Sequence, residues 1–403
     1  MRQPTTTLDP RADRIQRIAL IAGVVALALT ALGAFLDATT FFQAYLMAFL
    51  YWLALPLGCM ALAALYHLAG GVWGLPIRRP LEAAMITIPL FALLGIPLIL
   101  GWSSLYPWAR PEQVAADPIL QHREVWMNVP FTLGRYVLYF VLWSGGAYLL
   151  YRMSAEQDRT GDADLPRLLG RRARLALFFF VLAVTFSAFD WGMSLDPHWF
   201  STIYGVMFLI GDGLSAVAFA IIMLRILSQR SPTREVTTTQ TFNDMGNLLL
   251  AFVVLWAYMN LSQFIIIYTG NLPEENPWYL RRSEGLYYWI TLGLVLLQFV
   301  GPFFVLLARL NKRNAQRLSA LAGFILVTRV VDIYWMIAPE VRHEGAVLSW
   351  MDLTALVGVG GIWIAAYVWS LKRLPLVPLN DHRLANLVDA HGHPLTGAAH
   401  HEA

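Results

Sequence analysis

SAFDWGMSLDPHWFSTIYGVMFLIGDGLS, residues 187–215, places acidic side chains beside and inside two long apolar runs. Asp190 lies near the end of the first run, Asp196 and His198 lie in the loop, and Asp212 lies well inside the second run. A charged side chain at the centre of a bilayer costs about 2.5–3.5 kcal/mol on insertion scales. Acids in such positions need a structural or functional reason, so we look for function first in this hairpin.

The composition indicates a polytopic membrane protein. The chain has 403 residues, of which 58% are hydrophobic and 14% charged, whereas soluble domains carry about 25% charged residues. Runs of about 20 apolar residues, enough to cross a bilayer, occur ten times. The predicted spans are roughly Arg17–Leu36, Phe42–Leu68, Leu81–Leu100, Phe131–Tyr151, Ala173–Trp191, Ile203–Leu227, Gly246–Tyr268, Gly285–Leu307, Leu318–Ile337 and Met351–Leu371.

These spans divide the chain into three parts. Residues 1–16 form a polar N-terminal segment, residues 17–372 a ten-helix membrane domain, and residues 373–403 a polar tail that we expect to be disordered. The first apolar run lacks a small-residue cleavage site, so it is interpreted as a retained span and not a signal peptide. The loops are too short for a soluble domain.

Basic residues predict the orientation. Of the 29 Lys and Arg residues, 22 lie in the N-terminal segment, the even-numbered loops, the tail or the span ends next to them, and 5 lie in the odd-numbered loops. By the positive-inside rule both termini are expected to be cytoplasmic, and the acidic hairpin opens outward. Tryptophans gather at the opposite, outer interface: Trp102, Trp108, Trp126, Trp191, Trp199, Trp278, Trp335 and Trp350.

An internal repeat is visible at the outer ends of two spans. Asp190–Pro197 aligns with Asp332–Pro339, because each stretch has an aspartate followed by a proline seven residues later. Loops three and seven also both contain a Pro-Trp dipeptide. We therefore predict an all-α fold with two parallel four-helix bundles, spans two to five (about residues 42–197) and six to nine (about residues 200–339), flanked by spans one and ten.

Charged residues within the spans are candidates for a proton relay, each with a structural alternative. Asp212 lies between two glycines, which allow close approach of another helix or a ligand; it is either a protonatable relay group or a hydrogen-bonded lock between helices. Arg329 and Asp332 are spaced i, i+3 and can pair. Asp190 has Arg135 as its expected partner on another helix, unless Arg135 extends to the lipid headgroups.

The outer loop supplies the candidate quinone ligands. A histidine beside an aspartate is suited to accept a proton from a quinol hydroxyl near neutral pH. Asp190, Asp196 and His198 are therefore the candidate quinone-binding residues, although a surface or loop-capping histidine is a close alternative for His198.

Other polar residues favour structural readings. Asn260, Gln263 and Gln298 are expected to join helices. Glu82, beside Arg78 and Arg79, is a candidate for proton uptake at the cytoplasmic face but is interpreted more simply as part of a surface ion pair.

Several cofactor classes are excluded by residue counts. The chain has one cysteine, so it carries neither a disulfide framework nor a cysteine-ligated iron–sulfur cluster. Only His67 lies within a span, so no intramembrane histidine pair exists to ligate haem b, and no metal site is predicted. Any electron carrier must belong to a partner protein, and no feature indicates nucleic-acid binding.

The outer-face string FDWGMSLDPHWFSTIYG, within ten spans and two bundles, resembles the NrfD/polysulfide-reductase-type membrane subunits. It is most similar to the second such subunit of bacterial alternative complex III, a quinol:cytochrome c (or oxidase) oxidoreductase. The resemblance covers about residues 15–372, and its most specific part is Ser194–Gly205.

This resemblance implies a multi-subunit complex in the bacterial inner (cytoplasmic) membrane. Its expected partners are a sister NrfD-like membrane subunit, an iron–sulfur subunit, and multihaem and monohaem cytochrome c subunits. A quinone or menaquinone is the implied ligand, without any covalent cofactor, and haem and iron–sulfur clusters belong to the partner subunits. The implied function is quinol oxidation, proton translocation, or both, with Asp190 and Asp212 as relay groups and Arg135 and Arg329 beside them.

Two other classes of function remain open. A secondary transporter also has parallel repeats and acids near the midplane, although the spans lack obvious paired helix breaks. A scaffold that anchors redox partners without a ligand of its own is the third possibility. Solute uptake by the isolated protein would favour transport, and co-purification with haem subunits would favour the redox complex.

Overall fold

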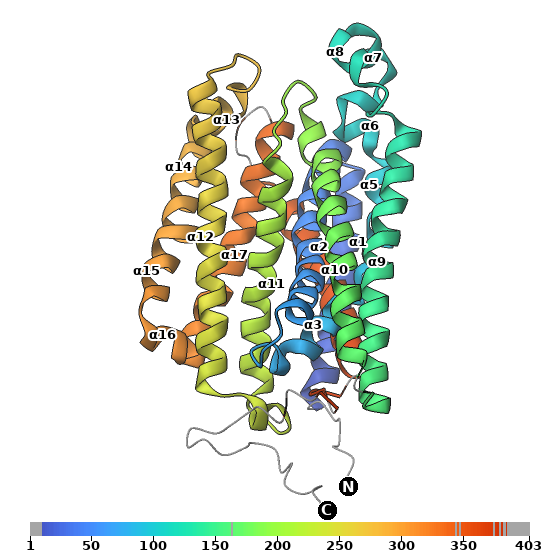
Figure 1. Cartoon of the computed structure of the whole chain (residues 1–403). Coiled ribbons are helices and arrows are strands. Elements are labelled where there is room, and N and C mark those ends of the chain that lie inside the picture. The colour runs from blue at the N-terminus through green and yellow to red at the C-terminus, as the bar shows by residue number, and fades with distance from the viewer. Residues whose placement is uncertain are drawn as a thin grey trace, which may run out of the picture.

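The computed structural model describes residues 10–162, 164–342, 345, 348–373, 375–378, 380, 381 and 384, and within them every regular element is helical (Figure 1). The first half contains α1 (Pro10–Ala34), α2 (Ala38–Ala69), η1 (Leu75–Ile77), α3 (Arg78–Met85), α4 (Ile88–Leu94), α5 (Ile96–Leu100), α6 (Trp102–Leu105), η2 (Pro107–Ala109), α7 (Pro111–Ala116), α8 (Pro118–Arg123), α9 (Val129–Thr160), α10 (Leu165–Trp191) and η3 (Met193–Leu195). The second contains α11 (Tyr204–Leu227), η4 (Thr233–Val236), α12 (Thr239–Gly270), α13 (Pro277–Arg282), α14 (Gly285–Leu294), η5 (Val295–Val300), α15 (Gly301–Leu307), α16 (Arg309–Arg313), α17 (Ala315–Val341) and α18 (Trp350–Leu371).

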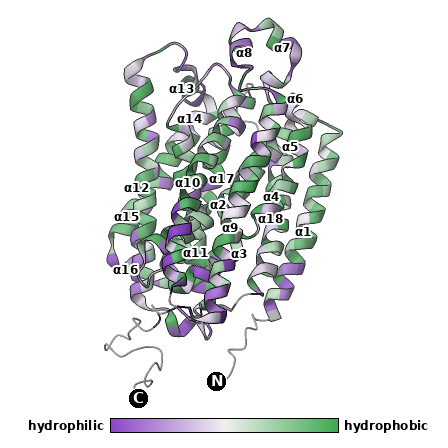
Figure 2. Ribbon diagram, turned by 45° about the vertical axis from the view of Figure 1, so that its right-hand side comes forward, coloured by the Kyte–Doolittle hydropathy of each residue, from purple (hydrophilic) through white to green (hydrophobic). Residues whose placement is uncertain are grey.

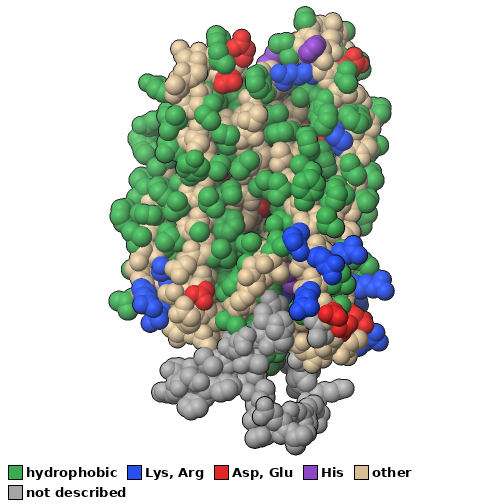
Figure 3. All heavy atoms as spheres, viewed as in Figure 1, with side chains coloured by type: hydrophobic (Ala, Val, Ile, Leu, Met, Phe, Trp, Pro, Cys, Tyr) green, Lys and Arg blue, Asp and Glu red, His purple; other side chains and the backbone are tan. Residues whose placement is uncertain are grey.

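Nine stretches of the described residues are long and apolar enough to cross a membrane. Figure 2 shows hydrophilic residues concentrated toward the two ends of these helices, and in Figure 3 the surface between those ends is mainly apolar. The chain is therefore a multi-pass, all-helical membrane protein, as predicted. The remaining predicted span lies in α9, a 32-residue helix, but Arg135 and several Tyr and Gly residues lower its hydropathy. The count of ten crossings stays a prediction.

Two of the spans are interrupted, the third and the eighth, which do not occupy corresponding positions in the two predicted bundles. The third divides into α3, α4 and α5, because Pro89 and Pro97 lack the amide hydrogen of a helix interior and disfavour helical backbone in the residues before them. The eighth contains a π-helical turn, η5, between α14 and α15. Such turns are frequent at functional sites, and this one borders the cavity described below.

Helix α2 lies at the centre of the molecule and packs against α3, α10, α11, α17 and α18. Its contact with α11 depends on Gly58, because a Cβ atom there would lie 2.0 Å from the Asp212 carbonyl oxygen. The flanking helices α1 and α18 pack on each other through Gly23, Gly358 and Gly361. Small residues permit this close approach of helices in membranes.

The N-terminal end of α1 and the C-terminal end of α18 lie at the same end of the molecule. There the Lys372 ammonium lies 2.5 Å from the Asp13 carboxylate. The described part of the tail folds back on this end: Leu376 and Val377 are buried, and Asp381 pairs with Arg78 at 2.8 Å. The predicted terminal segments also include residues 1–9 and tail residues beyond this described part, and these lie outside the described residues.

Candidate functional site

Asp190 and Arg135 form a buried pair between α10 and α9, which confirms the predicted partner. Arg135 Nε and Nη2 lie 2.7 and 2.8 Å from the two Asp190 carboxylate oxygens. Tyr139 Oη donates to the same carboxylate at 2.7 Å, and Trp126 Nε1 donates at 3.1 Å. Asp190 thus accepts four hydrogen bonds while only 3% exposed, an arrangement suited to locking two helices. Its role in quinone binding or proton relay remains a prediction.

A second charged cluster joins α11 and α17 in the interior. Arg329 pairs with Asp332 as their spacing predicted, and Arg329 Nε donates to the Ser215 hydroxyl at 3.3 Å. Trp256 of α12 donates its indole N–H to Asp332 Oδ2 at 2.9 Å. Asp212 faces the same guanidinium electrostatically, is 4% exposed, and makes no hydrogen bond through its carboxyl group to any described residue. The structure thus brings together three of the five predicted relay residues.

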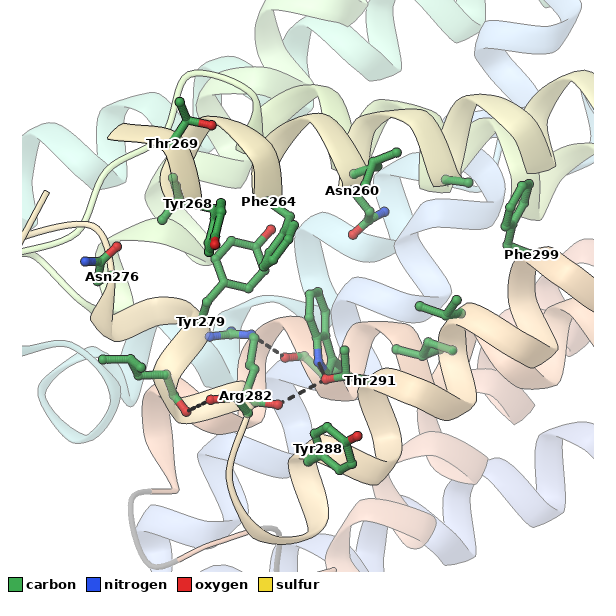
Figure 4. A pocket seen from close by; sticks show the side chains of 18 of the residues that line it. Asn260, Phe264, Tyr268, Thr269, Asn276, Tyr279, Arg282, Tyr288, Thr291 and Phe299 are labelled. Atoms are coloured by element: carbon green, nitrogen blue, oxygen red, sulfur yellow. Dashed lines mark hydrogen bonds between the residues drawn. The ribbon is translucent and has the colours of Figure 1, made fainter. Parts of the chain in front are cut away.

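A cavity of about 1110 Å³ lies between α12, α13, α14, η5 and α17 (Figure 4). Its walls are mostly aromatic and aliphatic. Exposed side chains of α12, α13 and α14 border it, among them Leu261, Tyr268, Leu280 and Tyr288. Since these helices present apolar surface, the cavity opens onto the face that lipid would cover, and a hydrophobic molecule would enter it from the membrane.

Two polar groups on the cavity wall have unused hydrogen-bonding capacity. Asn260 donates to the Trp256 carbonyl at 2.9 Å, and its Oδ1 accepts no hydrogen bond from a described residue. The Tyr279 hydroxyl is buried and has no partner among the described residues. Burial raises the pKa of Tyr279 above its ordinary value, so this hydroxyl remains a donor. Figure 4 shows both side chains extending toward the cavity.

Several other polar side chains of the wall are already paired. Trp335 donates to the Thr291 hydroxyl at 2.7 Å. Arg282 lies 3.5 Å from the Trp278 ring centroid and pairs with Glu340 at 2.6 Å. These contacts make one end of the cavity rigid, and they leave Asn260 and Tyr279 for a ligand.

Asp196 and His198 lie in a different place, a polar pocket of about 590 Å³ at the end of the molecule away from the chain termini. His198 Nε2 lies 2.7 Å from the Asp117 carboxylate, and Asp196 pairs with Arg281, which also pairs with Glu340. Although desolvation opposes it, the backbone N–H of Ile119 and the nearby His198 hold the pKa of Asp117 below its usual value. Ion pairs at this pocket therefore connect the loop that contains Asp196 and His198 to Asp117 on one side and to Arg281 on the other.

A third charged cluster lies at the opposite end, where Glu82 pairs with both Arg78 and Arg79. The Ser154 hydroxyl accepts from both arginines at 2.7 and 2.9 Å. The predicted ion pair is present, but the expectation that it lies at the surface is wrong, since Arg78, Arg79 and Glu82 are at most 1% exposed. Helix α9 and the described part of the tail cover it.

Sequence reasoning did not identify the cavity or the residues that line it. Asn260 was expected only to join helices. Gln298 does so by accepting a hydrogen bond from Thr328 of α17, whereas Gln263 accepts one from Ser201 in the loop before α11. The one available signal was an asparagine facing the same side of its helix as Trp256, four residues earlier.

No protein-family model matches this chain, and no curated protein is significantly similar to it. Inferences about function therefore depend on the geometry of the described residues and on the resemblance of the outer-face string.

Proposed function

We propose that this chain is an integral membrane subunit of a quinol:cytochrome c (or oxidase) oxidoreductase complex, and that its cavity between α12 and α14 holds the quinol. The cavity is the observation that carries the proposal. It is at the upper end of ordinary ligand-pocket volumes and is accessible from the apolar surface, as a membrane-dissolved quinol requires.

The free polar groups match the chemistry of a quinone headgroup. A quinol hydroxyl needs an acceptor, which Asn260 Oδ1 supplies, and a quinone carbonyl needs a donor, which the Tyr279 hydroxyl supplies. Aromatic rings such as Phe264, which packs edge-to-face on Tyr279 with centroids 5.3 Å apart, provide surface for a flat ring. Asp190, Asp196 and His198, the ligands first predicted, do not line this cavity; Asp196 and His198 share the separate polar pocket, which Asp190 does not line.

Quinol oxidation releases two electrons and two protons. In our proposal the electrons pass to a haem or iron–sulfur centre of a partner subunit, because the sequence has a single cysteine and no pair of histidines within its spans. The protons pass to protein carboxyl groups, for which Asp212 and Asp332 beside Arg329 are the candidates, since Asp332 accepts a hydrogen bond from Trp256 of the cavity wall. Arg135 and Asp190, whose hydrogen bonds are already complete, position the helices.

The proposal includes the finer topology. We place α9 as a tenth crossing, the two four-helix bundles on either side of the α2–α11 contact, and both termini on the cytoplasmic side of a bacterial inner membrane. Figure 3 supports this orientation, since Lys and Arg side chains are more numerous at the end near α16. The proposed partners are a sister membrane subunit, an iron–sulfur subunit and the two kinds of cytochrome c.

The test is quinol oxidation by the complex purified from its native membrane. Tyr279→Phe and Asn260→Leu each remove one proposed hydrogen bond, so each should raise the KM for quinol about two- to tenfold. Tyr258→Phe is the matched control, because Tyr258 is 60% exposed on α12 and does not line the cavity. Equal KM values in all three variants, or purification without haem subunits, would refute the proposal.

A further inference from the structure

A cluster of one arginine and two aspartates lies behind Trp256 as seen from the cavity. Arg329 pairs directly with Asp332. The backbone of Gly211, next to Asp212, packs so closely on the guanidinium that a Cβ atom there would lie 2.3 Å from Arg329 Nη2. One cation thus serves two carboxyl groups on different helices.

The two carboxyl groups are incompletely hydrogen-bonded. Asp332 is 0% exposed, and its Oδ1 is buried without a hydrogen-bond partner among the described residues. Asp212 has no side-chain hydrogen bond to a described residue. From α2, the Tyr51 hydroxyl also faces Arg329, but it is an uncharged phenol that donates to the Leu326 carbonyl at 3.1 Å.

Charge neutrality in the interior requires one proton in this cluster. A single guanidinium neutralises one carboxylate, and a second buried carboxylate without a partner is so costly that it takes up a proton instead. The unpartnered Oδ1 of Asp332 is a ready position for that proton, and the carboxyl group of Asp212 is the other.

Trp256 connects the cluster to the cavity. Its ring lines the cavity, and its N–H is the hydrogen bond that stabilises Asp332 as the charged member of the pair. A ligand that displaces the ring weakens this bond, and Asp332 then becomes the better acceptor of the shared proton.

We propose that Asp212 and Asp332 share one proton against Arg329, and that a ligand in the cavity shifts this proton between them through Trp256. Trp256 is thus a positioning residue, and the cluster is a proton-binding site. The inference depends on the proposed function only in taking quinol as the ligand.

The shared proton is tested on the purified full-length chain without quinone, by the infrared carbonyl band of a protonated buried carboxyl group. We expect one such band in the wild type. Asp212→Asn and Asp332→Asn should each abolish it, because the remaining aspartate then pairs with Arg329 as an anion. Asp352→Asn, which alters an aspartate paired with Arg342 at 2.6 Å, is the control and should keep the band. Absence of the band from the wild type, or its survival in either cluster variant, overturns the shared proton.

The coupling is tested by adding decylubiquinol to the same samples. The band should shift in the wild type, whereas Trp256→Phe should keep the resting band and lose the shift. A shift that persists in Trp256→Phe, or none in the wild type with bound quinol, overturns the role of Trp256. Failure of quinol to bind refutes the proposed function and the coupling together, while the resting band still decides the shared proton.

Discussion

Replacing Arg135 with methionine should destabilise the protein strongly. The substitution leaves the Asp190 carboxylate buried at 3% exposure, with hydrogen bonds only from Tyr139 and Trp126. Removing one partner of a buried ion pair typically costs about 3–5 kcal/mol, because the other charge stays buried and unpaired. We expect a loss of about that size in the free energy of unfolding, measured by tryptophan fluorescence in mixed detergent micelles.

The double variant Arg135→Met/Asp190→Leu should recover most of this loss, because apolar pairs often replace buried ion pairs at little cost. Arg159→Met is the matched control. Arg159 pairs with Glu156 at 2.7 Å but is 75% exposed, and such surface pairs are worth about 0–1 kcal/mol. If Arg135→Met and Arg159→Met lower stability equally, the reasoning that Asp190 and Arg135 lock α9 to α10 is wrong.

Three further predictions concern other contacts. Gly58→Val should cost about 1–3 kcal/mol of unfolding free energy, since its side chain meets the Asp212 backbone and must separate α2 from α11; unchanged stability in the same unfolding assay would contradict this. Because the Ile119 N–H and His198 depress the pKa of Asp117 in the folded protein, these contacts contribute stability above the unfolded pKa of about 3.9 that is lost as pH falls through the folded pKa. The protection factors for amide hydrogen exchange in α7 and α8, taken against the intrinsic rate at each pH, should therefore fall on acidification, and protection factors that stay flat would count against these contacts. Ser154→Ala should cost about 1–3 kcal/mol by leaving buried charged groups short of a partner, and a neutral result in thermal unfolding would show that water replaces the hydroxyl.

Part of the interior was predictable because charges inside apolar runs have few possible partners. Arg329 and Asp332 are one helical turn apart, so their pairing follows from helix geometry alone. Arg135 was the one arginine of the first half that lay more than three residues from the ends of a predicted span, and it pairs with Asp190 as expected. The position of Asp212 beside the Arg329–Asp332 pair was not predictable from the sequence, because it depends on the packing of α11 against α17.

The cavity could not be predicted, because its volume depends on the separation of helices. Apolar residues such as Leu261 and Phe299 have the same pattern whether they face lipid, another helix or an empty space. The break at η5 lies ahead of Pro302, which was visible in the sequence, but a proline predicts only that a helix is disturbed. Likewise, the burial of Glu82 depends on α9 and the tail, which are distant in sequence.

Labelling of the native complex with a photoreactive azido-quinone, followed by peptide mass spectrometry, tests the central claim most directly. We predict labels on α12 and α14, between Trp256 and Phe264 and around Thr291, that excess quinol abolishes and that Asn260→Leu weakens. Labels confined to the region of Asp190 and His198, or labels on α12 and α14 that excess quinol leaves unchanged, would contradict the assignment of this cavity to quinol.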